Sequence, residues 1–124
     1  MRKLADAALQ RARELGVEHA DFRLERLRSQ SIALRDGRLE GSDDSEGTGF
    51  AVRVVHDGTW GFASGVDITP EAAVRVAELA VEVARVSRPV NTERVELADE
   101  PVHGDVTWAS SYQMSPFDVA TPEK

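Results

Sequence analysis

An Asp57-Gly58 pair stands between two alternating apolar runs, and no other feature of the chain constrains the fold as strongly. Asp-Gly is among the pairs most favoured in a two-residue type I′ turn, which joins adjacent antiparallel strands. A three-residue loop would shift the register. With a two-residue loop, counting outward predicts these cross-strand partners: Val52 with Ala63, Arg53 with Phe62, Val54 with Gly61, and Val55 with Trp60.

The two faces of this hairpin have different side chains. One face combines Phe50, Val52 and Val54 with the small residues at 61 and 63, so a helix can approach it closely. Because the opposite face is also partly apolar, the sequence predicts that both faces are covered. The candidate interface residues lie on that opposite face: Arg53, Val55, Trp60 and Phe62. Two interpretations remain open for them, a cation–π contact within the hairpin or the docking of a partner or another domain.

A second hairpin is predicted upstream. Residues 20–25 alternate between apolar and charged, as in a half-buried strand, and the apolar phase slips over residues 27–31. The slip indicates either a bulge or bend in one long strand or a break into two. Asp36-Gly37 provides the turn, and we expect the acidic residues 41–47 to connect the two hairpins.

Two helices complete the predicted domain. Residues 2–15 are amphipathic and end at Gly16, a natural left-handed stop. Thr69-Pro70-Glu71 is a helix start, with Thr as N-cap and Pro at the first helical position. The following helix is apolar on most sides, so the sheet and either the first helix or a partner should cover it. The predicted fold is α+β: an antiparallel sheet of about four strands, built on two Asp-Gly hairpins, with two helices packed on one face.

The C-terminal part of the chain has a different character. Prolines interrupt residues 89–124, which show little periodicity, so we expect a domain over residues 1–88 followed by an extended linker. One short strand is expected near residues 106–108. Thr121-Pro122-Glu123 repeats the earlier helix-start pattern just before the last residue. A capped start without a helix behind it leads us to expect a fragment of a longer protein.

Composition and spacing exclude several classes of function. A net charge of −7 argues against autonomous nucleic-acid binding. No apolar run approaches the roughly 20 residues of a membrane helix, and there is no signal-peptide pattern, so we expect a cytoplasmic protein without a membrane partner. The chain has no cysteine, and His19, His56 and His103 lie in no metal-binding motif. No catalytic or metal-binding residue is therefore expected in this chain.

Several short motifs, each weak alone, occur together in a specific order. They are Ala-Asp-Phe-Arg-Leu-Glu at 20–25, Arg-Ser-Gln-Ser at 28–31, Arg-Asp-Gly-Arg-Leu-Glu-Gly at 35–41, Gly-Thr-Gly-Phe-Ala-Val-Arg-Val at 47–54, Asp-Gly-Thr-Trp-Gly-Phe-Ala at 57–63 and Ile-Thr-Pro-Glu-Ala-Ala at 68–73. In this combination the chain resembles the N-terminal domain of the TldD/PmbA family, also called modulators of DNA gyrase. The resemblance covers nearly the whole chain, and its tail is closer to the TldD-like branch.

The resemblance implies a cytoplasmic zinc metallopeptidase that assembles as a dimer of related subunits and cleaves peptides or unfolded chains. The family's zinc motif, His-Glu-x-x-x-His, lies downstream of this domain, and no position here matches it. The resemblance therefore implies a non-catalytic first domain, inactive alone, whose partners are a related subunit in a homo- or heterodimer and the downstream domain. Zinc would bind in that downstream domain.

Two alternatives from other classes remain. The chain could be a stand-alone interaction module that holds an extended peptide through its aromatic hairpin face or a sheet edge. It could also be a regulator associated with DNA gyrase, for which the acidic charge offers no support as DNA binding. A zinc motif beyond Lys124 would favour the peptidase subunit, and a stop codon there would favour the module.

Overall fold

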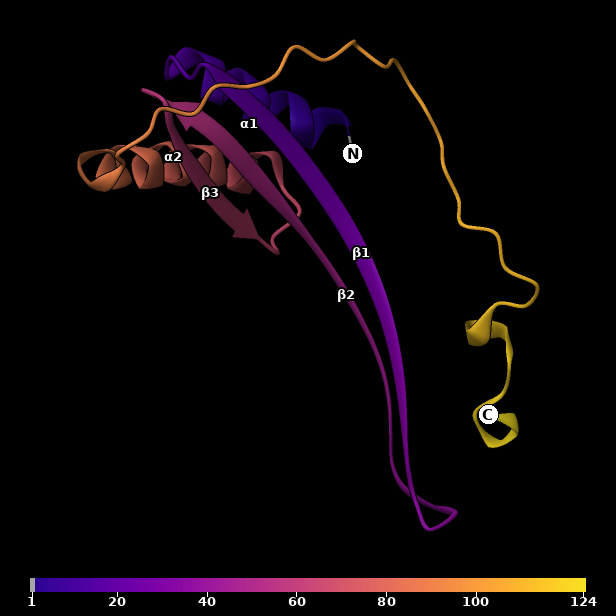
Figure 1. The fold of residues 1–124 in the computed structure, drawn as a ribbon. Helices are drawn as coiled ribbons and strands as arrows, with labels where there is room; N and C mark the ends of the chain where they lie inside the picture. The colour runs from indigo at the N-terminus through magenta and orange to yellow at the C-terminus, as the bar shows by residue number, and fades with distance from the viewer. Residues whose placement is uncertain (1) are drawn as a thin grey trace. The chain divides into compact units, whose positions relative to one another are not determined.

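The computed structural model describes residues 2–124 and shows an α+β fold (Figure 1). The chain forms two compact units, one of residues 2–29 and 45–97 and the other of residues 30–44 and 98–124. The elements follow in the order α1 (Arg2–Glu14), β1 (His19–Arg35), β2 (Arg38–His56), β3 (Thr59–Gly65) and α2 (Pro70–Ser87), with three short 3-10 helices after them: η1 (Arg88–Val90), η2 (Pro116–Asp118) and η3 (Thr121–Glu123).

The sheet is antiparallel between β2 and β3 and has the strand order β1-β2-β3. Both predicted turns have the backbone of a type I′ hairpin: Asp36 and Asp57 have φ of 48° and 47°, and Gly37 and Gly58 have φ of 74° and 65°. The register predicted for the second hairpin is confirmed at all four pairs, from Val52 opposite Ala63 to Val55 opposite Trp60.

The predicted strand count was too high, because the sheet has three strands rather than about four. Residues 27–31, where the apolar phase slips, lie inside the continuous strand β1. Residues 41–47, predicted as an acidic connection, belong to β2. Cross-strand contacts between polar side chains explain the difference: Arg26 bonds to Glu46 at 2.5 Å, and Gln30 donates to Asp44 at 2.7 Å.

Both helices begin and end close to the predicted positions. Helix α1 ends at Glu14, and Gly16 follows it with a left-handed φ of 76°. At the start of α2 the Thr69 hydroxyl accepts a hydrogen bond from the backbone N–H of Ala72 at 3.2 Å, which confirms the predicted N-cap. Arg11 of α1 bonds to Glu78 of α2 at 2.8 Å, so the first helix does cover one side of the second.

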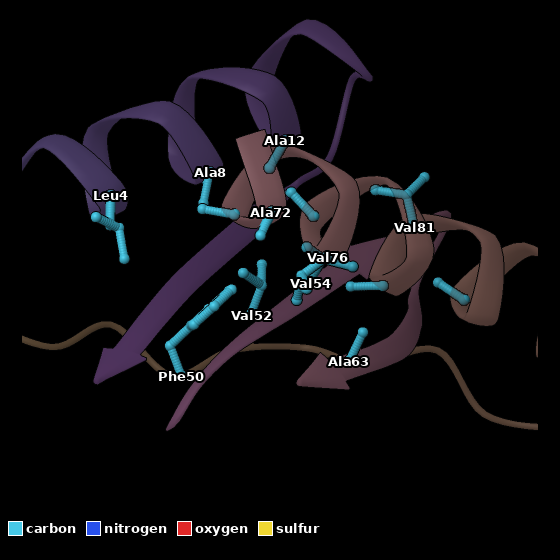
Figure 2. Packing of buried hydrophobic residues seen from close by; sticks show 14 residues of the cluster. Leu4, Ala8, Ala12, Phe50, Val52, Val54, Ala63, Ala72, Val76 and Val81 are labelled. Atoms are coloured by element: carbon cyan, nitrogen blue, oxygen red, sulfur yellow. The ribbon is translucent and has the colours of Figure 1, made fainter. Parts of the chain in front are cut away.

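The core lies between the two helices and one face of the sheet (Figure 2). Leu4, Ala8 and Ala12 of α1 belong to the same buried cluster as Val52 and Val54 of β2, which are fully buried. Across the sheet the rings of Phe22 and Phe50 stack with centroids 5.6 Å apart. The buried part of α2 consists of alanines and valines: Ala72, Ala73, Val76, Ala77, Ala80, Val81 and Ala84.

Glycine at position 61 allows α2 to lie directly on β3. A Cβ added to Gly61 would lie 1.9 Å from the carbonyl oxygen of Ala80 and 2.9 Å from the Cβ of Ala84. The predicted close approach of a helix to this face is therefore confirmed.

The C-terminal residues contain no β-strand among residues 98–124, so the strand expected near residues 106–108 is not present. The predicted helix start at Thr121 forms the short 3-10 helix η3. None of the helices in the part of the chain that the structure describes is both long and apolar enough to cross a membrane.

Candidate functional site

The face of the sheet opposite the helices is only partly covered, contrary to the prediction that both faces are. Phe62 is 58% exposed and Trp60 is 38% exposed. Arg53 lies on the same face, but Val55 is only 1% exposed and is covered within this chain. Of the four candidate interface residues, the structure therefore brings three to the surface. Their role in binding a partner stays a prediction.

Arg53 is held in a defined position on this face. Its guanidinium carbon lies 4.8 Å from the centroid of the Trp60 ring, which confirms the predicted cation–π contact. Its Nε donates to the Asp21 carboxylate at 2.8 Å. His19 contacts the Trp60 ring edge-on, with ring centroids 6.3 Å apart. These contacts fix Trp60 on one side and leave Phe62 beside it as the more exposed ring.

A groove of about 580 Å³ lies on this face next to Phe62. Arg23 and Glu25 at its rim bond to each other at 2.8 Å, so their charges are compensated. The rest of the lining is mainly apolar or glycine and comes from all three strands and the residue after β3: Leu27, Gly47, Thr48, Gly49, Phe50, Ala51, Phe62, Ser64, Gly65 and Val66. Such a groove can hold apolar side chains or a polypeptide backbone.

A second exposed apolar stripe lies on α2. Leu79, Val83 and Val86 are 53%, 37% and 69% exposed, and their spacing of four and three residues places them on one side of the helix. The sequence indicated that α2 needs cover on more than one side. The sheet and α1 provide part of that cover, and this stripe remains accessible in the described residues.

The side chains do not fit a zinc site. Among residues 2–124 no three His, Asp or Glu side chains come together as a metal-binding group. A structural or catalytic zinc needs three or four such ligands around one point. His19 has Asp21 at 3.3 Å, which is a pair rather than a ligand set.

The β2–β3 turn makes several contacts with the segment that follows α2, and the sequence did not indicate them. Asp57 accepts hydrogen bonds from Arg88 at 3.1 Å and Arg94 at 3.0 Å, and the pKa of Asp57 is lowered from 3.8 by Arg94 first and Arg88 second. The carbonyl of Gly58 accepts from the backbone of Val95 at 2.9 Å. These contacts hold the segment after α2 against the hairpin. The partners are more than 30 residues apart, and no local pattern marks them.

Sequence and structure comparisons agree with this architecture. Residues 20–84 match the family profile described as PmbA/TldA metallopeptidase domain 1. A protein named metalloprotease from Methanothermobacter thermautotrophicus is 32% identical over 87% of this chain and 22% of its own length. Another metalloprotease, from Methanocaldococcus jannaschii, is 28% identical over 86% of this chain and 24% of its own length.

A solved structure has a similar fold. The crystal structure of TldE from Thermococcus kodakarensis superimposes with a TM-score of 0.61 over 86% of this chain and 24% of that chain, at 16% sequence identity. The matched part of each relative is about a quarter of its length.

The fold and surface define an α+β domain with two helices on one sheet face and exposed aromatic rings on the other. The chain belongs to the PmbA/TldA metallopeptidase family and corresponds to its first domain.

Proposed function

We propose that this chain acts as the non-catalytic N-terminal domain of a TldD/PmbA-type zinc metallopeptidase subunit that takes part in proteolysis. The observation that carries the proposal is the match of residues 20–84 to the first domain of that family. The scattered positions of His19, His56 and His103 support the non-catalytic role, because zinc hydrolysis needs several ligands at one point.

In this proposal the zinc and the catalytic groups belong to a downstream domain of the same protein. The proposed partners are that domain and a related subunit, in a homo- or heterodimer, and the proposed substrates are peptides in the cytoplasm. The domain would shape the subunit and control access to its catalytic centre rather than bind metal.

The open sheet face is the proposed docking surface for those parts. Aromatic residues and arginine are enriched at the centres of protein interfaces, where they contribute most of the binding energy. Phe62 is exposed beside the ordered pair of Arg53 and Trp60, so part of this face is arranged before a partner binds. The exposed stripe at Leu79, Val83 and Val86 on α2 offers a second apolar contact.

A reconstitution experiment tests the accessory role. The longer protein would be prepared intact and without residues 1–124, and both would be assayed for bound zinc and for hydrolysis of an unfolded peptide. We expect the shortened protein to keep its zinc and lose most of its hydrolysis, and the 124-residue chain added in trans to restore it. Unchanged hydrolysis by the shortened protein, or loss of its zinc, would contradict the proposal.

A stand-alone interaction module is the second candidate, and the exposed Phe62 with its neighbouring groove favours it. The two functions differ in one observable result. A module retains a binding partner as an isolated chain, without a catalytic domain. An accessory domain affects hydrolysis only together with the catalytic part of the protein.

A further inference from the structure

The first compact unit continues beyond its last long helix. Helix α2 ends at Ser87, but the unit extends to Leu97 through residues that form no β-strand and only the short helix η1. We call residues 88–97 the strap. None of the strap residues is buried, and none belongs to the buried core cluster. The hydrophobic core therefore does not hold the strap in place.

Uncharged hydrogen bonds fix the strap against the β2–β3 turn at two points. The side-chain amide of Asn91 donates to the carbonyl of Gly58 at 3.1 Å and to the hydroxyl of Thr59 at 3.0 Å. The backbone N–H of Val95 donates to the same Gly58 carbonyl at 2.9 Å. These bonds determine the path of the strap across the turn.

Charged contacts join the strap to the turn and to the start of β1. The guanidinium of Arg94 donates to Asp57 at 3.0 Å and to Glu18 at 3.4 Å. Glu18 also accepts a hydrogen bond from the backbone N–H of Gly58 at 3.1 Å. Near the other end of the strap, Arg88 donates to the second carboxylate oxygen of Asp57 at 3.1 Å. One carboxylate, that of Asp57, thus bonds to two arginines of the strap.

Gly58 leaves the space in which Arg94 lies. A Cβ added to Gly58 would lie 2.9 Å from Nε and 3.0 Å from Cγ of Arg94. The other hairpin has Gly37 at the equivalent turn position, and a Cβ there would meet no atom within 4 Å. Alanine is strained at both positions because φ is positive, but only at Gly58 would it also displace Arg94. The two glycines therefore separate the requirement of the turn from the contact with the strap.

The contacts of the strap are of a kind that opens at low cost. The side chains of Arg94, Asp57 and Glu18 are each about half exposed. Exposed ion pairs contribute little individually, and salt screens them. Segments with few buried apolar contacts open locally while the rest of a domain stays folded. The strap meets this condition, whereas α2 and the sheet that it covers do not.

We propose that the strap is a salt-sensitive device that opens as one unit while the rest of the domain stays folded, and that Arg94 is the residue that closes it. In the closed state the chain leaves the first compact unit after Leu97. In the open state it leaves at the end of α2, which adds residues 88–97, at most about 35 Å of extended chain. Opening would thus lengthen the connection to the residues that follow. The proposal does not depend on the peptidase role.

Amide hydrogen exchange of the 124-residue chain, measured by NMR, tests the opening at a single bond. The N–H of Val95 is protected by its bond to Gly58, so its exchange reports the strap. The N–H of Ala73 donates to the carbonyl of Thr69 at 3.0 Å and belongs to a fully buried residue, so its exchange reports the core. Between 0.05 and 1 M sodium chloride we expect exchange at Val95 to become about threefold faster, with no change at Ala73.

Three variants test which contacts close the strap. Arg94→Gln should speed exchange at Val95 about fivefold at low salt and remove most of its salt dependence. Asn91→Ala should also speed exchange at Val95 about fivefold, because the strap opens as one unit. Gly58→Ala should speed it about fivefold more than the matched control Gly37→Ala does. Exchange at Ala73 should be unchanged in Arg94→Gln and Asn91→Ala.

Several results would overturn the proposal. Equal acceleration at Val95 and Ala73, by salt or by Arg94→Gln, would show that the strap opens only when the whole domain unfolds. Unchanged exchange at Val95 in Arg94→Gln would show that Arg94 does not close it. Acceleration by Arg94→Gln but not by Asn91→Ala would show that the contacts break separately rather than as one unit.

Discussion

Gly61 lies so close to Ala80 that a Cβ on the glycine would sit 1.9 Å from the alanine carbonyl oxygen. This contact sets the distance between β3 and α2, because the obstacle is backbone and cannot rotate away. Ala84 blocks the same space from the next turn of the helix. The close contact of α2 with β3 at this point therefore requires a residue without a side chain at position 61.

Gly61→Ala should lower the free energy of unfolding by about 3 kcal/mol, since the added methyl forces α2 away from β3. The measurement is chemical denaturation followed by circular dichroism. Gly47→Ala is the matched control, because its Cβ would enter open space within the same sheet. Equal stability of the two variants would contradict the close contact.

The stability of the chain should depend on the ionisation of Asp57. Hydrogen bonds from Arg94 and Arg88 lower the pKa of Asp57 in the folded protein below 3.8. A depressed pKa contributes stability that is complete above the unfolded pKa and is lost as pH falls through the folded pKa. The stability advantage of the wild type over Asp57→Asn should therefore be constant from neutral pH to about pH 5 and disappear below the folded pKa.

Asparagine at position 57 tolerates the left-handed backbone, so this variant removes the charge while keeping the turn. Asp36→Asn is the control, because Asp36 has the same turn conformation, whereas Arg88 and Arg94 form their ion pairs with Asp57. Denaturation of the three proteins across this pH range provides the comparison. The unfolding free energies of Asp36→Asn and of the wild type should change with pH in the same way. If they diverged as much as those of Asp57→Asn and the wild type, the role of Asp57 would be refuted.

The N-cap of α2 should contribute measurably to stability. Thr69→Ala removes the hydroxyl that accepts from the backbone of Ala72, and we expect it to cost about 1 kcal/mol. Thr69→Ser keeps an acceptor at the same place and should lose only a few tenths of a kcal/mol. Thermal unfolding by calorimetry distinguishes the two. A loss with serine as large as that with alanine would show that the hydroxyl is not the cause.

Arg53 and Trp60 should be energetically coupled. A double-mutant cycle with Arg53→Ala and Trp60→Ala is expected to give a coupling of about 0.5–1 kcal/mol, as for a partly exposed cation–π pair. The same cycle on Arg53 and Phe62 gives a coupling energy for comparison, because these two residues lie opposite each other on β2 and β3. Additive effects of Arg53→Ala and Trp60→Ala would mean that the contact does not contribute.

The parts of the fold that the sequence predicted correctly depend on local chemistry. Asp-Gly turns, the Thr69 cap and the Gly16 stop are each determined by a few neighbouring residues. The register of the second hairpin then follows from the turn by counting. The small residue at 61 also marked the face that the helix approaches.

The parts that sequence reasoning missed depend on contacts between distant residues. Residues 41–47 are polar and contain turn-forming types, yet they extend as a strand because Glu46 and Asp44 bond to side chains of β1. The contacts of Asp57 with Arg88 and Arg94 span more than 30 residues. Val55 is buried, whereas Trp60 and Phe62 on the same face are exposed. The alternation of apolar and polar residues alone did not indicate this difference.

The central claim is that this domain serves a zinc peptidase without binding zinc itself. The most direct measurement is the zinc content of the purified 124-residue chain by mass spectrometry, together with its hydrolysis of an unfolded peptide, beside the longer protein. The account predicts less than a tenth of an equivalent of zinc and no hydrolysis for the chain alone, and both for the longer protein. Stoichiometric zinc or turnover in these 124 residues would contradict it.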